Sequence, residues 1–126
     1  MLNVYGAARC GPGGSILDGS PIDRLPIASR LLSFPASEAF MMRATGNSML
    51  PRINEGDLVI ARRATEPHHG RVYICVNDEE CLIKIVRLVN GTVILESLNA
   101  SEYPMFAAAA DFRVEGEVKQ TISGKI

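Results

Sequence analysis

The sequence has few of the features that mark membrane, secreted or nucleic-acid-binding proteins. Its apolar runs are only a few residues long, whereas a helix needs about 20 apolar residues to cross a bilayer. No basic and then apolar leader opens the chain, so we expect a cytoplasmic protein with no membrane contact. A formal net charge of −1 provides no field that would hold nucleic acid. We therefore expect any contact with DNA to come from a domain absent from this chain.

Cysteine and histidine are also scarce, which narrows the possible chemistry. The three cysteines, Cys10, Cys75 and Cys81, are odd in number and lack metal-ligand spacing, so we expect no disulfide framework, no metal site and no cofactor. Cys75 and Cys81 lie in apolar runs and are interpreted as small buried hydrophobic residues. The two histidines, His68 and His69, are adjacent in a turn sequence, which favours solvated turn residues over catalytic or metal-binding ones.

What is present suits one domain of 126 residues, 47% of them hydrophobic, with room for one core. Residues 1–37 are rich in Gly, Pro and Ser, and we expect an extended N-terminal arm with one helical turn near 28–32. Residues 38–126 predict short strands separated by turn signals. The expected strands are 39–45, 58–63, 71–76, 81–88, 92–97 and 112–122, and the one further helix candidate is 105–112.

Asn90-Gly91 is the strongest short hairpin signal in the chain, because both residues tolerate the positive φ angles of a type I′ turn. Repeated strands at this spacing predict a mainly β fold, either a mainly antiparallel sheet or a partly closed barrel.

The stretch "GNSMLP", residues 46–51, contains a single serine, Ser48. This serine is either an ordinary turn residue or a nucleophile. As a nucleophile, Ser48 needs a base beside it, and lysine can serve where histidine does not. Of three lysines, Lys119 and Lys125 lie in polar surroundings, whereas Lys84 lies between Ile83 and Ile85 in "CLIKIVRL". Desolvation there would favour the neutral amine that accepts a proton. The alternative is an edge strand that points Lys84 into solvent.

Two stretches resemble a known family. "GNSMLPRINEGDLVIARR" followed by "EECLIKIVRL" is similar to the C-terminal domain of the LexA-like self-cleaving proteins, which comprise LexA, the UmuD mutagenesis proteins and the lambdoid phage CI repressors. "LESLNASEYPMF" and "VEGEVKQTI" add weaker similarity, so the resemblance covers about residues 38–122. It implies a LexA-like fold in which Ser48 is the nucleophile and Lys84 the general base. Leu82 stands where relatives often carry Thr.

The resemblance also implies that the substrate is the chain itself, at an Ala-Gly or Cys-Gly bond some three dozen residues before the serine. Cys10-Gly11 lies 38 positions before Ser48, and a glycine lets the backbone enter a narrow cleft. We expect backbone N–H groups around Asn47 and Ser48 to form the oxyanion hole, by the general logic of such sites.

The leading hypothesis is the self-cleaving dimerisation domain of a LexA- or CI-like transcriptional repressor, which ends repression in the DNA-damage (SOS) response. The resemblance implies a homodimer, a RecA–single-stranded DNA filament as co-protease, and DNA binding only through a helix-turn-helix domain absent from this chain. The alternatives are a complete UmuD-like protein, a catalytically silent dimerisation module, and a signal peptidase, which the lack of a membrane segment disfavours. Upstream gene sequence would separate the first two readings.

Overall fold

The computed structural model describes residues 1–6, 21 and 23–123, and its described part is mainly β, as predicted. The strands are β1 (Leu2–Tyr5), β2 (Asp23–Leu25), β3 (Ala39–Arg43), β4 (Leu58–Arg63), β5 (Arg71–Asn77), β6 (Glu80–Val89), β7 (Thr92–Glu96), β8 (Phe106–Ala107) and β9 (Arg113–Ile122). Two short 3-10 helices, η2 (Ser29–Leu31) and η3 (Ala36–Glu38), precede β3. No helix within these described ranges is long and apolar enough to span a membrane.

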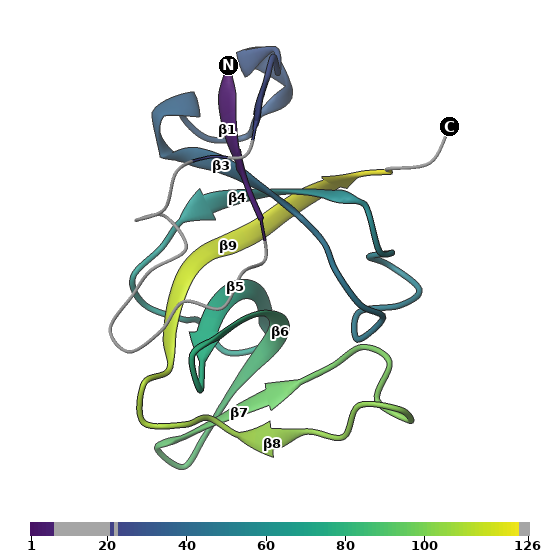
Figure 1. The fold of residues 1–126 in the computed structure, drawn as a ribbon. Helices are drawn as coiled ribbons and strands as arrows, with labels where there is room; N and C mark the ends of the chain where they lie inside the picture. Colours follow the sequence, from purple (N-terminus) through teal and green to yellow (C-terminus); the bar gives the residue numbers. More distant parts are fainter. Residues whose placement is uncertain (7–20, 22, 124–126) are drawn as a thin grey trace.

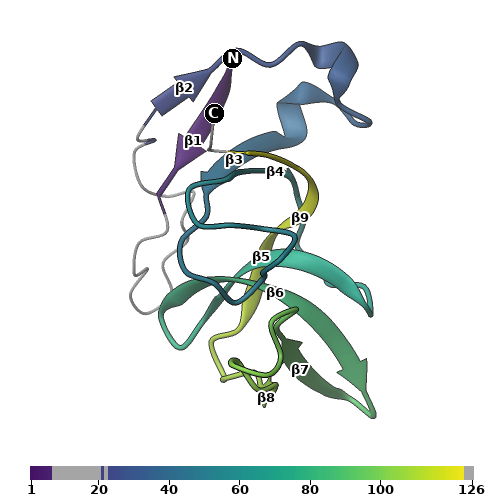
Figure 2. The same ribbon diagram turned by 90° about the vertical axis from the view of Figure 1, so that its right-hand side faces the viewer.

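The strands form one sheet in the order β2-β1-β3-β4-β9-β5-β6-β7-β8. Neighbours are antiparallel except β1 and β3, which pair in parallel, and within the described part the outer strands β2 and β8 are not paired to each other. The sheet is therefore open and mixed. Figures 1 and 2 show β9 running from the group β1–β4 to the group β5–β8. The last strand thus joins the two halves, through a ladder to β4 and a ladder to β5.

Most of the predicted strands are confirmed, together with the turns between them. β4 begins and ends at the predicted residues, and the other predicted strands differ by a few residues at their ends. The Asn90-Gly91 turn is confirmed by φ angles of 49° and 78°, which are the positive values that a type I′ turn needs. β6 and β7 flank this turn and pair from Val89 opposite Thr92 onward.

Two parts of the chain differ from the expectation. The helix predicted for residues 105–112 is wrong, because Phe106–Ala107 form β8 and pair with β7; a short alanine run cannot repay the cost of helix nucleation. Within the predicted arm, η2 confirms the helical turn, but β1 lies inside the sheet with Leu2 and Val4 buried. The division between arm and domain at residue 37 stays a prediction.

The core lies on both faces of the sheet and fixes the two halves of the site. On one face Phe40, Met42 and Ile74 pack with residues of the loop between β3 and β4. On the other, Tyr73 and Leu95 pack around the β5–β6–β7 strands. Gly116 on β9 permits the first packing, because a Cβ there would lie 2.6 Å from Cε1 of Phe40.

Candidate active site

Ser48 lies in the loop that joins β3 to β4, and apolar anchors on its C-terminal side hold this loop in place. Met49 and Ile53 are buried in the core, and the Ile53 N–H donates to the Met49 carbonyl at 3.0 Å. Ser48 itself is only partly buried. The burial of Met49 explains the apolar residue after the serine in the sequence: it fixes the loop so that the hydroxyl keeps a defined place at the surface.

Asn99, beyond the end of β7, holds the serine loop from the opposite side. Its backbone N–H donates to the Ser48 carbonyl at 2.9 Å, and its side-chain Nδ2 donates to the Asn47 carbonyl at 3.1 Å. The β3–β4 loop and the chain after β7 therefore lie side by side, as can be followed in Figures 1 and 2. Because Asn47 and Ser48 take part in these two bonds through their carbonyl oxygens, the bonds do not use the backbone N–H groups of Asn47 and Ser48.

Lys84 lies on β6, between β5 and β7, with only 5% of the residue exposed. The edge-strand alternative is therefore wrong, and the buried-lysine interpretation is confirmed. Nζ donates a 2.6 Å hydrogen bond to Oγ of Ser97, which is 2% exposed. The ring centroids of Tyr103 and Phe106 lie 5.5 Å and 5.9 Å from Nζ, so aromatic faces cover the amine where water would otherwise solvate it.

Burial lowers the pKa of the Lys84 amine from its ordinary value of 10.5, because an ammonium loses its hydration in an apolar strand. A thiolate at Cys75 on β5 would act in the opposite direction. However, burial raises the pKa of Cys75 to about 12, so its thiol stays neutral over the range in which Lys84 titrates. The structure thus favours a neutral amine at a lower pH than a solvated lysine would need.

The hydroxyl of Ser48 and the amine of Lys84 are not hydrogen-bonded to each other in this structure. Among the hydrogen bonds of the described residues, Nζ of Lys84 donates to Ser97. The two groups are instead connected through residues 97–99, since Ser97 contacts the amine and Asn99 contacts the serine loop. Two residues of chain span at most about 7 Å, so both elements lie within one small region.

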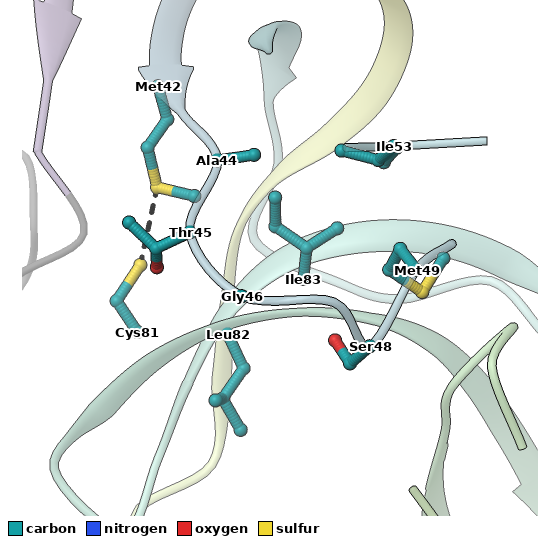
Figure 3. Close-up of a pocket in the computed structure, with 10 residues that line it drawn as sticks. All are labelled: Met42, Ala44, Thr45, Gly46, Ser48, Met49, Ile53, Cys81, Leu82 and Ile83. Atoms are coloured by element: carbon teal, nitrogen blue, oxygen red, sulfur yellow. Dashed lines mark hydrogen bonds between the residues drawn. The ribbon is translucent and has the colours of Figure 1, made fainter. Parts of the chain in front are cut away.

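A cavity of about 90 Å³ opens beside Ser48. Its wall combines the serine loop with β3 and the start of β6, and it is formed by Met42, Ala44, Thr45, Gly46, Ser48, Met49, Ile53, Cys81, Leu82 and Ile83. Figure 3 shows Ser48 at one side of this space with its hydroxyl oxygen turned toward Leu82 and Ile83. None of the lining side chains is charged, so the cavity suits a small uncharged side chain more than a charged one.

The remaining residues considered in the sequence are the predicted oxyanion-hole groups, the predicted cleavage bond and the two histidines interpreted as turn residues. The N–H groups of Asn47 and Ser48 take part in none of the backbone hydrogen bonds found in the described chain, which leaves both able to donate. The Cys10-Gly11 bond lies outside the described residues. His68 and His69 serve the β4–β5 turn: the His68 N–H donates to the Tyr73 hydroxyl and His69 Nδ1 accepts from Leu88 N–H.

No metal centre competes with this site in the part of the chain that the structure describes. Within residues 1–6, 21 and 23–123, no group of three His, Cys, Asp or Glu side chains could hold a metal ion. Cys75 is buried and Cys81 is partly buried, in agreement with their interpretation as small apolar residues.

The sequence analysis missed Ser97 and Asn99, although a signal for Ser97 was present. A two-residue turn at Asn90-Gly91 pairs Val89 with Thr92 and, counting outward, Ile85 with Glu96. The next position along this register places Lys84 opposite Ser97, and directly opposed residues share a face of the sheet. Asn99 carried no such local signal, because its contact depends on the path of a loop.

Comparison with known proteins gives a consistent result. The Peptidase S24-like family matches residues 3–119. The LexA repressor of Pelagibacter ubique is 35% identical over 95 residues, 68% of this chain and 41% of the relative. LexA repressor 1 of Nocardia farcinica is 33% identical over 113 residues, 78% and 52% of the two chains. An uncharacterized HTH-type transcriptional regulator of Haemophilus influenzae is 31% identical over 111 residues, 82% and 46%. The chain spans about half the length of these relatives.

Proposed function

The chain belongs to the Peptidase S24-like family, and from this premise we propose that it is a self-cleaving domain with Ser48 as nucleophile and Lys84 as general base. The observation that carries the proposal is the buried amine of Lys84, whose lowered pKa favours the form that can accept a proton. Lysine is almost never fully buried unless it is paired, and the hydrogen-bond partner of Lys84 is a neutral hydroxyl.

The reaction would be an acyl transfer followed by hydrolysis. Ser48 Oγ attacks the carbonyl carbon of Cys10 while its proton passes to Nζ of Lys84. The resulting ammonium returns that proton to the Gly11 nitrogen as the peptide bond breaks. Water then attacks the ester on Ser48 while Lys84 accepts its proton. Nζ passes that proton to Ser48 Oγ as the ester bond breaks, which restores the serine and releases the Cys10 carboxyl group, which ionises in water.

Two features of the site support this chemistry. The N–H groups of Asn47 and Ser48 are available to stabilise the negative charge that develops on the carbonyl oxygen. The small cavity beside Ser48, which has no charged lining residue, would take the small side chain of Cys10. Presentation of the arm by the same chain would supply proximity in place of strong substrate binding.

As part of a longer protein, the domain would act in a LexA- or CI-like repressor that is inactivated by its own cleavage during the SOS response. Its partners would be a second copy of the chain and a RecA–single-stranded DNA filament, with DNA bound by a helix-turn-helix domain outside this chain. The LexA repressors among the relatives support this role.

A catalytically silent dimerisation module is the second candidate, and a specific observation favours it. The hydrogen bond of Lys84 goes to Ser97 and not to Ser48, so the base is not engaged with the nucleophile in this arrangement. An active site would need Ser48 or the arm to approach the amine further.

Incubation of the purified chain toward pH 10 tests the two candidates. We expect slow cleavage with a new N-terminus at Gly11, detected by mass spectrometry, at a rate that rises with pH as Lys84 loses its proton. Ser48→Ala and Lys84→Ala should each abolish cleavage, whereas the control Lys119→Ala should cleave like the wild type. Cleavage that survives either site substitution would reject the assignment, and an intact wild-type chain that remains folded would favour the silent module.

A further inference from the structure

We propose that Ser97 is a positioning residue that holds the Lys84 amine in place for the reaction, through the hydrogen bond from Nζ to Oγ. This inference rests on the proposed function of Ser48 and Lys84, because it assigns a role toward that base. Ser97 does not touch the reacting bond and exchanges no proton in this role.

The position of Ser97 follows from the hairpin and not from a chance approach of two flexible groups. The Asn90-Gly91 turn fixes the register of β6 against β7, with Ile85 opposite Glu96. Ser97 continues that register by one residue and therefore faces Lys84. Its short side chain is 2% exposed, so the oxygen has one defined place from which to accept the 2.6 Å bond.

The hydrogen bond to Ser97 restricts the conformations of the Lys84 side chain, which a lysine base needs. A lysine stem has four carbons and many rotamers, and a neutral amine carries two N–H groups and one lone pair. Donation of one N–H to Ser97 fixes rotation about the last bond of the stem. The rings of Tyr103 and Phe106 cover the amine, so the lone pair is confined to the directions that remain.

The neighbouring elements contribute few charges at this place. Cys75 on β5 stays a neutral thiol, as argued above, and Glu115 on β9 is paired with Arg113 at 3.4 Å. Tyr73, opposite Lys84 on β5, directs its hydroxyl to His68 and Glu117. Among the hydrogen bonds of residues 1–6, 21 and 23–123, the bond of the amine goes to Ser97, and removal of this hydroxyl should alter both the orientation and the titration of Lys84.

The test compares Ser97→Ala, Ser97→Cys and Ser97→Thr with the wild type, and uses Ser101→Ala in the exposed loop after β7 as the matched control. Self-cleavage is followed from pH 6 to 10 by mass spectrometry. Titration of Lys84 is followed separately, in the Ser48→Ala background, by NMR of ¹³C-labelled lysine, where Lys119 and Lys125 serve as internal references. Thermal unfolding of each variant shows whether it is folded.

For Ser97→Ala we expect the cleavage rate at high pH to fall about tenfold or more, which is part of the roughly 10²–10⁴-fold that a general base contributes. The titration midpoint of Lys84 should also move to lower pH, because the ammonium loses its hydrogen-bond acceptor. Ser97→Thr, which keeps the hydroxyl, should restore both, and Ser101→Ala should change neither. Ser97→Cys keeps the size of the side chain but is a weak acceptor, so it should behave like Ser97→Ala even if the alanine variant does not fold.

The inference is overturned if folded Ser97→Ala or Ser97→Cys cleaves at the wild-type rate and Lys84 titrates unchanged. A rate that falls without any change in the Lys84 titration also contradicts it, since general damage to the fold would have that effect. If the wild type does not cleave at all, the proposed function fails. In that case the NMR titration still decides whether Ser97 holds the amine.

Discussion

The bond between Lys84 and Ser97 predicts a strong energetic coupling, which a double-mutant cycle can measure. We use the Ser48→Ala background so that the proposed self-cleavage cannot interfere. In this background, Ser97→Ala leaves a buried ammonium without its acceptor. A hydrogen bond to a charged group contributes about 1.5–3 kcal/mol, so we expect a destabilisation of this size. Lys84→Met also removes a bond but removes the buried charge with it, and should cost far less or stabilise.

The double variant Lys84→Met/Ser97→Ala replaces both partners with apolar groups and should lie close to Lys84→Met. The coupling energy should therefore be about 1.5–3 kcal/mol. With an unfolding entropy of about 2.1 cal/mol/K per residue, a chain of 126 residues shifts its Tm by about 4 °C per kcal/mol. Ser97→Ala alone should thus lower the Tm by roughly 6–12 °C.

Urea denaturation at pH 7 and thermal unfolding, both followed by circular dichroism, give the four free energies of the cycle. Ser101→Ala serves again as the control and should lie within about 0.5 kcal/mol of the parent. Penalties of the two single variants that add to within about 0.5 kcal/mol would refute the reasoning, because independent sites behave in that way.

Two further predictions concern the core and the pH dependence of stability. Gly116→Ala should destabilise the fold by about 1–3 kcal/mol, measured by urea denaturation, because the new Cβ would lie 2.6 Å from the Phe40 ring and 3.0 Å from Cβ of Ala61; an unchanged midpoint would contradict this packing. Burial lowers the pKa of Lys84 from 10.5, so the unfolded chain binds more protons than the native state between the two values. The stability of the wild type relative to Lys84→Met should therefore rise with pH between the two pKa values, and a difference that falls with pH would contradict this prediction. The thiol of Cys75, whose pKa burial raises to about 12, is present in both proteins and does not account for a difference between them.

The sequence was a good guide to local structure because its strand and turn signals are short and strong. The apolar run in "LVIARR" and the turn signal "NEGD" before it predict β4 with both of its bounds. Asn90-Gly91 predicts its turn from the backbone preferences of two residues. The parallel pairing of β1 with β3 was not predicted, since it depends on contacts between distant segments. The placement of β9 between β4 and β5 depends on such contacts too.

The sequence singled out the candidate nucleophile and base, but not the residues that contact them. Lys84 stood out because a lysine between two isoleucines conflicts with ordinary burial preferences, and the resemblance paired it with Ser48. Leu82 stands where relatives often carry Thr and has no polar side-chain atom, so the sequence did not indicate a hydrogen-bond partner for the Lys84 amine. Ser97 could be found only by extending the hairpin register past the last residue of the strand, and Asn99 only from the structure.

The position of β9 determines when the sheet can be completed during synthesis of the protein. Ser48 belongs to the half of the sheet that holds β3 and β4, and Lys84 to the half that holds β5 and β6, and residues 113–122 are the strand to which both halves are bonded. On the ribosome, both residues emerge long before that strand does. If Ser48 and Lys84 act as proposed above, a nascent chain would carry both residues before the sheet is complete, and self-cleavage would have to wait until β9 has been made.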